Sequence, residues 1–206
     1  MTRTFGIVIF PDVEELDFVG PIEVFGSFAK YFDKDWRVVT VAQTSEPVHA
    51  AKGLTVVPDH TFDDCPPLEV VLVPGGFGTR QEMSNPAMLD FVQRTGGAAQ
   101  WVTSVCTGAL VLSRAGFLKG REATTHWAAL NELRAEPDVR VVERRFAVDG
   151  NVITAAGVSA GIDMALYLVG QLASPETARN VQKAIEYYPE PPFAEEAVAA
   201  SSRKEA

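Results

Sequence analysis

Short apolar runs alternate with segments of helical spacing along this chain, and no other feature restricts its possible folds as strongly. Continuous runs rich in β-branched residues are typical of strands buried on both faces. They occupy residues 5–10, 37–42, 69–76, 100–105 and 151–157. The segments between them that have helical spacing are 19–32, 87–95, 108–115, 128–135 and 159–172. The alternation predicts an α/β sandwich, with helices covering both faces of a mostly parallel sheet.

The length and composition indicate one domain. A chain of 206 residues, 47% of them hydrophobic, can close a substantial core without disulfide or metal staples. We expect this domain to span residues 1–193 and to be followed by a polar, alanine-rich tail over 194–206 that is frayed or disordered. The sequence Asp149-Gly150-Asn151 predicts a hairpin that adds antiparallel strands to the sheet.

The charge pattern and the scarcity of metal-binding residues exclude several classes of function. A net charge of −9 without a basic cluster argues against nucleic acid or an anionic membrane as a partner, and favours a small-molecule substrate. The first apolar run is too short for a signal peptide or a membrane span, so we expect a cytoplasmic protein with two reduced cysteines. The three histidines are scattered and no phosphate-binding glycine motif opens a helix, so neither a metal nor another cofactor is expected.

Cys106 stands between an apolar strand and a segment that begins a helix at Thr107 or Gly108. This order of strand, sharp turn and helix is that of a nucleophile elbow. Free amides at the helix start would favour a thiolate and lower the pKa of Cys106. A buried structural cysteine is an equally strong interpretation of position alone, because free cysteine is among the most buried residue types.

Two glycines end the preceding strand, in the sequence LVPGGFG. In a parallel sheet this loop lies beside the elbow, and glycine lets a backbone approach a ligand closely. We expect the amides of Gly75 and Gly76 to complete an anion hole with the amide of Thr107. The alternative is an ordinary Pro-Gly-Gly turn.

Asp17 follows the first strand and is flanked by Leu16 and Phe18. A carboxyl in apolar surroundings has its pKa raised and can donate or shuttle a proton. A helix is expected to begin near Gly20-Pro21, because proline suits a first helical turn. Asp17 would alternatively cap the N-terminus of that helix.

His126, in the sequence REATTHWAAL, is a candidate general base for Cys106. A lone histidine is more often structural, and the position just before the 128–135 segment also suits a capping residue. The sequence alone leaves both roles open.

Five separated blocks together resemble the ThiJ/PfpI superfamily, whose fold is flavodoxin-like and related to class I glutamine amidotransferases. The resemblance extends over almost the whole chain. Within the superfamily the blocks are most similar to the isocyanide hydratase branch. The blocks are LDFVGPIEVF, LVPGGFGT, VCTGALVLSRAGFLKGREATTHW, AGVSAGIDMALYLV and AIEYYPEPPF.

The resemblance implies a cysteine-dependent lyase that hydrates isocyanides to N-substituted formamides. Cys106 would attack the terminal carbon to give a thioimidate, Asp17 would act as general acid and base, and Thr107 would line the site. Gly76 would lie near Thr107, and Val158 would lie behind Cys106 and shape the pocket. The resemblance also implies a homodimer that needs no cofactor.

Two other functions are compatible with the same blocks. One is a non-enzymatic redox or effector-sensing domain, like that of AraC-type regulators, in which Cys106 would oxidise or the pocket would bind an effector. The other is hydrolysis of the glyoxalase or deglycase type.

Overall fold

A central sheet of seven strands, in the order β10-β11-β7-β6-β1-β2-β5, organises residues 2–193, which the computed structural model describes. Every neighbouring pair is parallel except β10 and β11, which form the antiparallel hairpin expected at Asp149-Gly150-Asn151. Two small pairs, β3 with β4 and β8 with β9, lie outside the sheet. The strands are β1 (Arg3–Val8), β2 (Trp36–Ala42), β3 (Val48–His49), β4 (Thr55–Val56), β5 (His60–Thr61), β6 (Val70–Val73), β7 (Trp101–Val105), β8 (Glu122–Ala123), β9 (Arg140–Val141), β10 (Phe146–Asp149) and β11 (Val152–Ala155).

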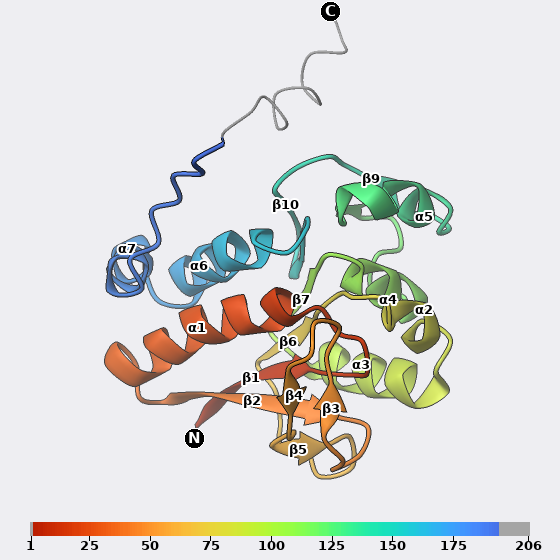
Figure 1. The fold of residues 1–206 in the computed structure, drawn as a ribbon, viewed down its shortest axis with the longest axis horizontal. Coiled ribbons are helices and arrows are strands. Elements are labelled where there is room, and N and C mark those ends of the chain that lie inside the picture. The colour runs from red at the N-terminus through yellow and green to blue at the C-terminus, as the bar shows by residue number, and fades with distance from the viewer. Residues whose placement is uncertain (1, 194–206) are drawn as a thin grey trace, which may run out of the picture.

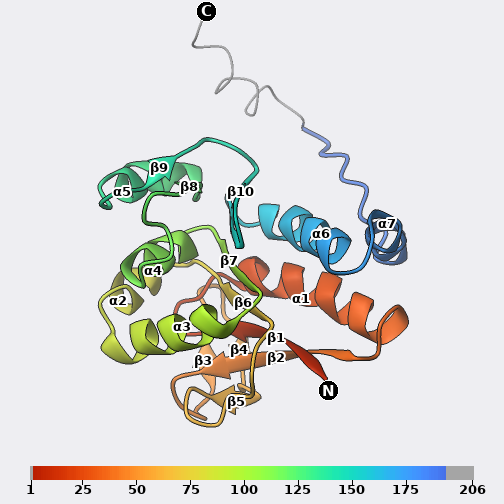
Figure 2. The same cartoon turned by 180° about the vertical axis from the view of Figure 1, so that it is seen from behind.

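Helices cover both faces of this sheet, which confirms the predicted α/β architecture. Helices α1, α6 and α7 lie on one side of the sheet, and α2, α3 and α4 lie on the other (Figure 1), as the view from behind also shows (Figure 2). The helices are α1 (Glu15–Tyr31), α2 (Thr79–Glu82), α3 (Pro86–Ala98), α4 (Gly108–Arg114), α5 (Leu130–Arg134), α6 (Ala160–Leu172) and α7 (Pro175–Ala184), with a 3₁₀ turn at Trp127–Ala129.

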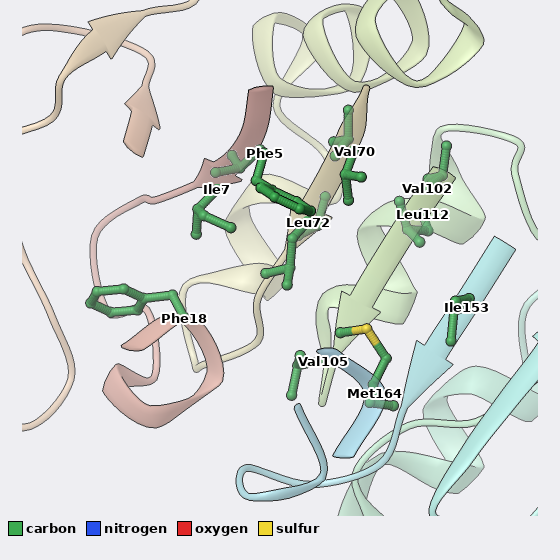
Figure 3. Packing of buried hydrophobic residues seen from close by; sticks show 14 of the residues in the cluster. Phe5, Ile7, Phe18, Val70, Leu72, Val102, Val105, Leu112, Ile153 and Met164 are labelled. Atoms are coloured by element: carbon green, nitrogen blue, oxygen red, sulfur yellow. The ribbon is translucent and has the colours of Figure 1, made fainter. Parts of the chain in front are cut away.

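The hydrophobic core consists of the side chains that the central strands place on their two faces. All four residues of β6 and all four of β11 are buried. Phe5 of β1 stacks on Phe25 of α1 with ring centroids 4.2 Å apart. Figure 3 shows Phe5, Leu72 and Val102 along neighbouring strands of this core. Double-sided burial explains why these strands are continuous apolar runs rather than alternating ones.

Helix α1 begins at Glu15, five residues before the expected start at Gly20. Two backbone amides beyond β3, those of Lys52 and Leu54, donate to the Glu15 carboxylate and fix this first turn. Pro21 therefore lies inside the helix and lacks the N–H that would bond to the carbonyl four residues earlier. A Cβ on Gly20 would lie 2.9 Å from Ile162, so glycine permits close packing of α1 on α6.

Some elements were not expected from the apolar pattern. Helix α7 is capped by Ser174, whose hydroxyl accepts from the Thr177 amide, and it buries only Val181. The four-residue helix α2 follows the glycine loop after β6. The expected tail lies outside the described residues, so its conformation stays a prediction.

None of the helices in the described part of the chain combines the length and apolar character that crossing a membrane requires.

Candidate active site

Cys106 occupies the sharp turn between β7 and α4, with a φ of 56° that few residues other than glycine adopt. Its amide donates to the carbonyl oxygens of Ala155 and Ala156 at 3.0 and 2.8 Å, and its carbonyl accepts from the Thr125 hydroxyl at 2.7 Å. These contacts hold the residue in a strained backbone conformation. A Cβ on Gly108 would lie 2.0 Å from the Val73 carbonyl, so only glycine fits the next turn. The elbow geometry expected from the sequence is therefore present.

Gly75 lies at the point where three parts of the site meet. A Cβ built on it would lie 2.6 Å from the Thr107 amide nitrogen, 2.7 Å from Oδ2 of Asp17 and 2.7 Å from Cβ of Cys106. The Gly75 amide donates to Oδ2 of Asp17 at 2.8 Å. Gly75, in the loop that follows β6, thus lies in contact with both the Asp17 carboxyl of α1 and the Cys106 side chain of the elbow.

Asp17 is fully buried, and it does not cap the helix. Its Oδ1 atom has no hydrogen-bond partner among the described residues. Burial raises the pKa of Asp17 to about 7, and the Gly75 amide and the neighbouring Cys106 thiol offset only part of that effect. Near neutral pH this carboxyl therefore exists in both protonation states, as an acid–base group must.

The pKa of the Cys106 thiol differs from the expectation. Burial and the neighbouring Asp17 carboxylate raise its pKa to about 12, while hydrogen bonding to Thr107 opposes this. Desolvation outweighs the favourable amides at the helix start, so the resting side chain is a thiol and not the low-pKa thiolate that the sequence predicted. Nucleophilic attack then requires a base, and Asp17 is the carboxyl beside it.

The amides of Gly75 and Gly76 do not form the expected open anion hole. The Gly75 amide is engaged by Asp17, and the Gly76 amide donates to the Thr107 hydroxyl at 3.0 Å. That hydroxyl donates in turn to the Gly76 carbonyl at 3.1 Å, and Thr79 lies against both groups. The two amides therefore position Asp17 and Thr107, leaving the Thr107 amide as the donor near the sulfur.

A cavity of about 200 Å³ opens above Cys106. Asp17 does not line it, and its carboxyl is held next to Cys106 by the Gly75 amide. Most of the wall is carbon, so the cavity suits an apolar substituent with one reactive end at the sulfur. The lining residues are Glu14, Gly76, Phe77, Arg80, Cys106, Thr107, His126, Ala128, Ala129 and Val158.

His126 lines this cavity, but its ring is used for capping. Nδ1 accepts a hydrogen bond from the Ala128 amide at 3.2 Å, at the start of the 3₁₀ turn. Burial lowers the pKa of His126, so the ring is neutral near pH 7. No hydrogen bond joins His126 to Cys106, whereas Asp17 and Cys106 shift each other's pKa. Of the two roles that the sequence left open for His126, general base or cap, the ring has the capping role in this structure.

Val158 reaches the cavity from the start of α6, as expected, and has an unusual φ of 42° for a β-branched residue. Sequence reasoning missed two residues of the opposite wall, Phe77 and Arg80. Phe77 directly follows the Gly-Gly pair and Arg80 lies four residues beyond it, and this closeness to the pair was the available signal. The Arg80 guanidinium lies over the Phe77 ring and forms an ion pair with Glu132 at 2.7 Å.

The parallel sheet, the strained cysteine elbow and the buried carboxyl beside it define a cysteine-elbow α/β protein. The family model described as the DJ-1/PfpI family matches residues 4–171, so the chain belongs to that family.

The most informative relatives come from pseudomonads. The chain is 43% identical over 196 residues to an isonitrile hydratase of Pseudomonas putida, covering 94% of this chain and 82% of that protein. A solved ThiJ/PfpI family protein from Pseudomonas syringae is 35% identical, with a TM-score of 0.87 over 98% of this chain and 85% of the other. An HTH-type transcriptional regulator of Pseudomonas aeruginosa is 27% identical over 89% of this chain, which spans only 54% of that regulator.

Proposed function

We propose that this protein hydrates isocyanides, also called isonitriles, to N-substituted formamides. The observation that carries the proposal is the buried Asp17 carboxyl, with one unpaired oxygen, beside the Cys106 thiol at the base of an apolar cavity. The 43% identity to an isonitrile hydratase over nearly the whole chain supports the same reaction.

In the first step the sulfur of Cys106 attacks the terminal carbon of R–N≡C. Oδ1 of Asp17 accepts the thiol proton as the S–C bond forms, because a thiol with a pKa near 12 is a poor nucleophile on its own. Asp17 then delivers that proton to the same carbon, giving the thioimidate R–N=CH–S–Cys106. The thiol S–H has added across the carbon, and Asp17 is again a carboxylate.

In the second step Asp17 removes one proton from water as the oxygen attacks the thioimidate carbon, and passes that proton to the nitrogen. The C–S bond of the tetrahedral adduct then breaks as its hydroxyl group gives up the second water proton to Asp17, which returns it to the sulfur, and R–NH–CHO leaves. The sum is the addition of one water to one isocyanide. The Thr107 amide is placed to stabilise negative charge on the sulfur as it attacks and leaves.

The walls of the cavity fit this chemistry. Phe77, Ala129 and Val158 offer carbon surface to the R group. The isocyanide group itself is small and nearly linear, so it can reach the sulfur of Cys106, which lines the cavity.

The proposal includes a cytoplasmic homodimer. Leu16 and Val19 on α1 are each more than a third exposed, which supports a subunit contact on that helix. The free thiols of Cys65 and Cys106 suit a reducing compartment. Sedimentation velocity tests the dimer: a monomer at micromolar concentration would contradict it.

The test of the reaction is formamide production from p-nitrophenyl isocyanide by the wild type, Cys106→Ala and Asp17→Asn. We expect turnover by the wild type alone. A folded wild type that leaves both aryl and alkyl isocyanides unchanged would contradict the proposal. Turnover of α-oxoaldehydes in their place would indicate glyoxalase-type chemistry, and binding without turnover would indicate a sensor domain.

A further inference from the structure

A second cavity, of about 260 Å³, lies at the carboxyl ends of β1 and β2. It shares no lining residue with the cavity above Cys106. Ligands of open α/β sheets gather at this edge of the sheet. The lining residues are Ile9, Phe10, Pro11, Ala42, Gln43, Thr44, Glu46, Pro47, Val48, Gln81, Glu82, Asn85 and Met88.

Glu82, the last residue of α2, puts a nearly buried carboxyl group in this wall. The residue is only 6% exposed, and its sole hydrogen-bond partner among the described side chains is the Asn85 amide, at 2.8 Å. Glu82 forms no ion pair with the Lys, Arg and His side chains of the described part of the chain. A buried carboxylate without a cation is costly, and desolvation accordingly raises the pKa of Glu82.

The groups around Glu82 carry negative charge but no positive charge, and the hydrogen-bond donors among them, on Gln43, Thr44, Gln81 and Asn85, are neutral. The side-chain nitrogen of Asn85 donates to Glu82 and to the Gln43 side-chain oxygen, at 2.8 and 2.9 Å. The Asn85 side-chain oxygen accepts from the Ala87 amide, so it is also used. Glu46 adds a second carboxylate to the wall, and the wall contains no Lys, Arg or His. The polar side of the cavity therefore favours a ligand that brings N–H donors and a positive charge.

Apart from the neutral polar residues Thr44 and Gln81, the rest of the wall is apolar. Phe10, Val48 and Met88 are buried core residues that face the cavity, and Pro11 and Pro47 add rigid carbon surface. A ligand that satisfies both sides has a cationic nitrogen at one end and a short hydrocarbon at the other. We propose that this cavity binds a small organic ammonium ion whose nitrogen donates to Glu82 and whose alkyl chain lies against Phe10 and Met88.

The test uses n-butylammonium chloride as the probe and isothermal titration calorimetry at constant ionic strength. We expect saturable binding by the wild type and weakening of about tenfold or more in Glu82→Gln, which keeps the shape and removes the charge. The uncharged probe n-butanol should bind to the wild type no more tightly than n-butylammonium binds to Glu82→Gln. Isocyanide turnover is not part of this measurement, so the result does not depend on the proposed reaction.

Three further variants make the test specific. Glu176→Gln, on an exposed position of α7, is the matched control and should bind as the wild type does. Glu46→Gln removes an exposed carboxylate of the wall and should weaken binding less than Glu82→Gln does. Gln43→Lys places a tethered ammonium from an exposed position near Glu82 and should abolish binding, even if Glu82→Gln fails to fold. No saturable binding by the wild type, or equal binding by Glu82→Gln, would overturn the proposal.

Discussion

The Gly75 amide donates to Oδ2 of Asp17 at 2.8 Å, which leaves Oδ1 of this buried carboxyl without a partner among the described residues. One oxygen therefore fixes the orientation of the carboxyl, and the other is available for a proton. Cys106 lies on the same side, because a Cβ on Gly75 would touch both side chains. The consequences of this arrangement can be measured through stability, thiol reactivity and turnover.

Replacement of Asp17 by asparagine should change how stability depends on pH. The folded-state pKa of about 7 lies above the ordinary aspartate pKa of 3.8, so the native state holds the proton more tightly than the unfolded chain does. Wild-type stability should therefore fall between about pH 4 and pH 7, by up to about 4 kcal/mol, and this fall should be absent in Asp17→Asn. Urea unfolding at pH 5 and pH 8 measures it. Exposed Asp90→Asn is the control and should keep the wild-type pH dependence.

Turnover should require the ionised form of Asp17. Because the carboxylate must accept the thiol proton, kcat/KM should rise with pH through about 7 and level off above it. A pH–rate profile with an aryl isocyanide checks this. A profile that is flat from pH 5 to pH 9 would contradict the assignment of Asp17 as the base.

Alkylation by iodoacetamide should be slow at Cys106 near neutral pH. Its pKa of about 12 reflects burial and the Asp17 charge, so Asp17→Asn should lower that pKa and accelerate alkylation at pH 9. The rates are followed by mass spectrometry in a Cys65→Ser background, which removes the other thiol. Fast alkylation of the wild type at pH 6 would show instead that the resting state is a thiolate.

A methyl group at Gly75 should damage both the fold and the site. The added Cβ of Gly75→Ala would meet the Thr107 amide nitrogen at 2.6 Å, and neither backbone can move freely. We expect a loss of about 1–3 kcal/mol in the free energy of unfolding, together with reduced turnover. Gly97→Ala, in α3 with nothing within 4 Å of the new Cβ, is the matched control and should be neutral or stabilising. Equal stability of the two variants would refute the close contact.

His126→Asn should preserve the chemistry. Asparagine can still accept from the Ala128 amide, which is the hydrogen bond that the His126 ring makes in this structure. We expect kcat within about tenfold of the wild type and an unchanged pH–rate profile, because the proposed general base is Asp17. If kcat/KM of this variant no longer rose with pH through about 7, His126 and not Asp17 would be the base.

The sequence predicted the α/β class, the hairpin at Gly150 and the cysteine elbow, because these depend on local patterns. Apolar runs report burial on two faces, and a positive φ at Gly150 suits the turn. The start of α1 was predicted too late because Pro21 was interpreted as a first-turn residue. The contacts that start the helix at Glu15 come from Lys52 and Leu54, which are distant in sequence.

The electrostatics of the site could not be obtained in the same way. The sequence places Cys106 at a helix start, which favours a low pKa, but the opposing burial and the Asp17 charge depend on tertiary packing. The hydrogen bonds that occupy the amides of Gly75 and Gly76 join segments 31 and 58 residues apart. Arg80 reaches the cavity wall from α2, a helix too short to give a periodic signal, and Phe77 reaches it from the loop just before that helix.

The most direct test of the central claim is the intact mass of the protein quenched during turnover of p-nitrophenyl isocyanide. We predict a transient species heavier by the mass of one isocyanide, located on the peptide that contains Cys106 and absent from Cys106→Ala. Formamide production by the wild type with no such adduct, together with turnover by a folded Cys106→Ala variant, would contradict covalent catalysis by this cysteine.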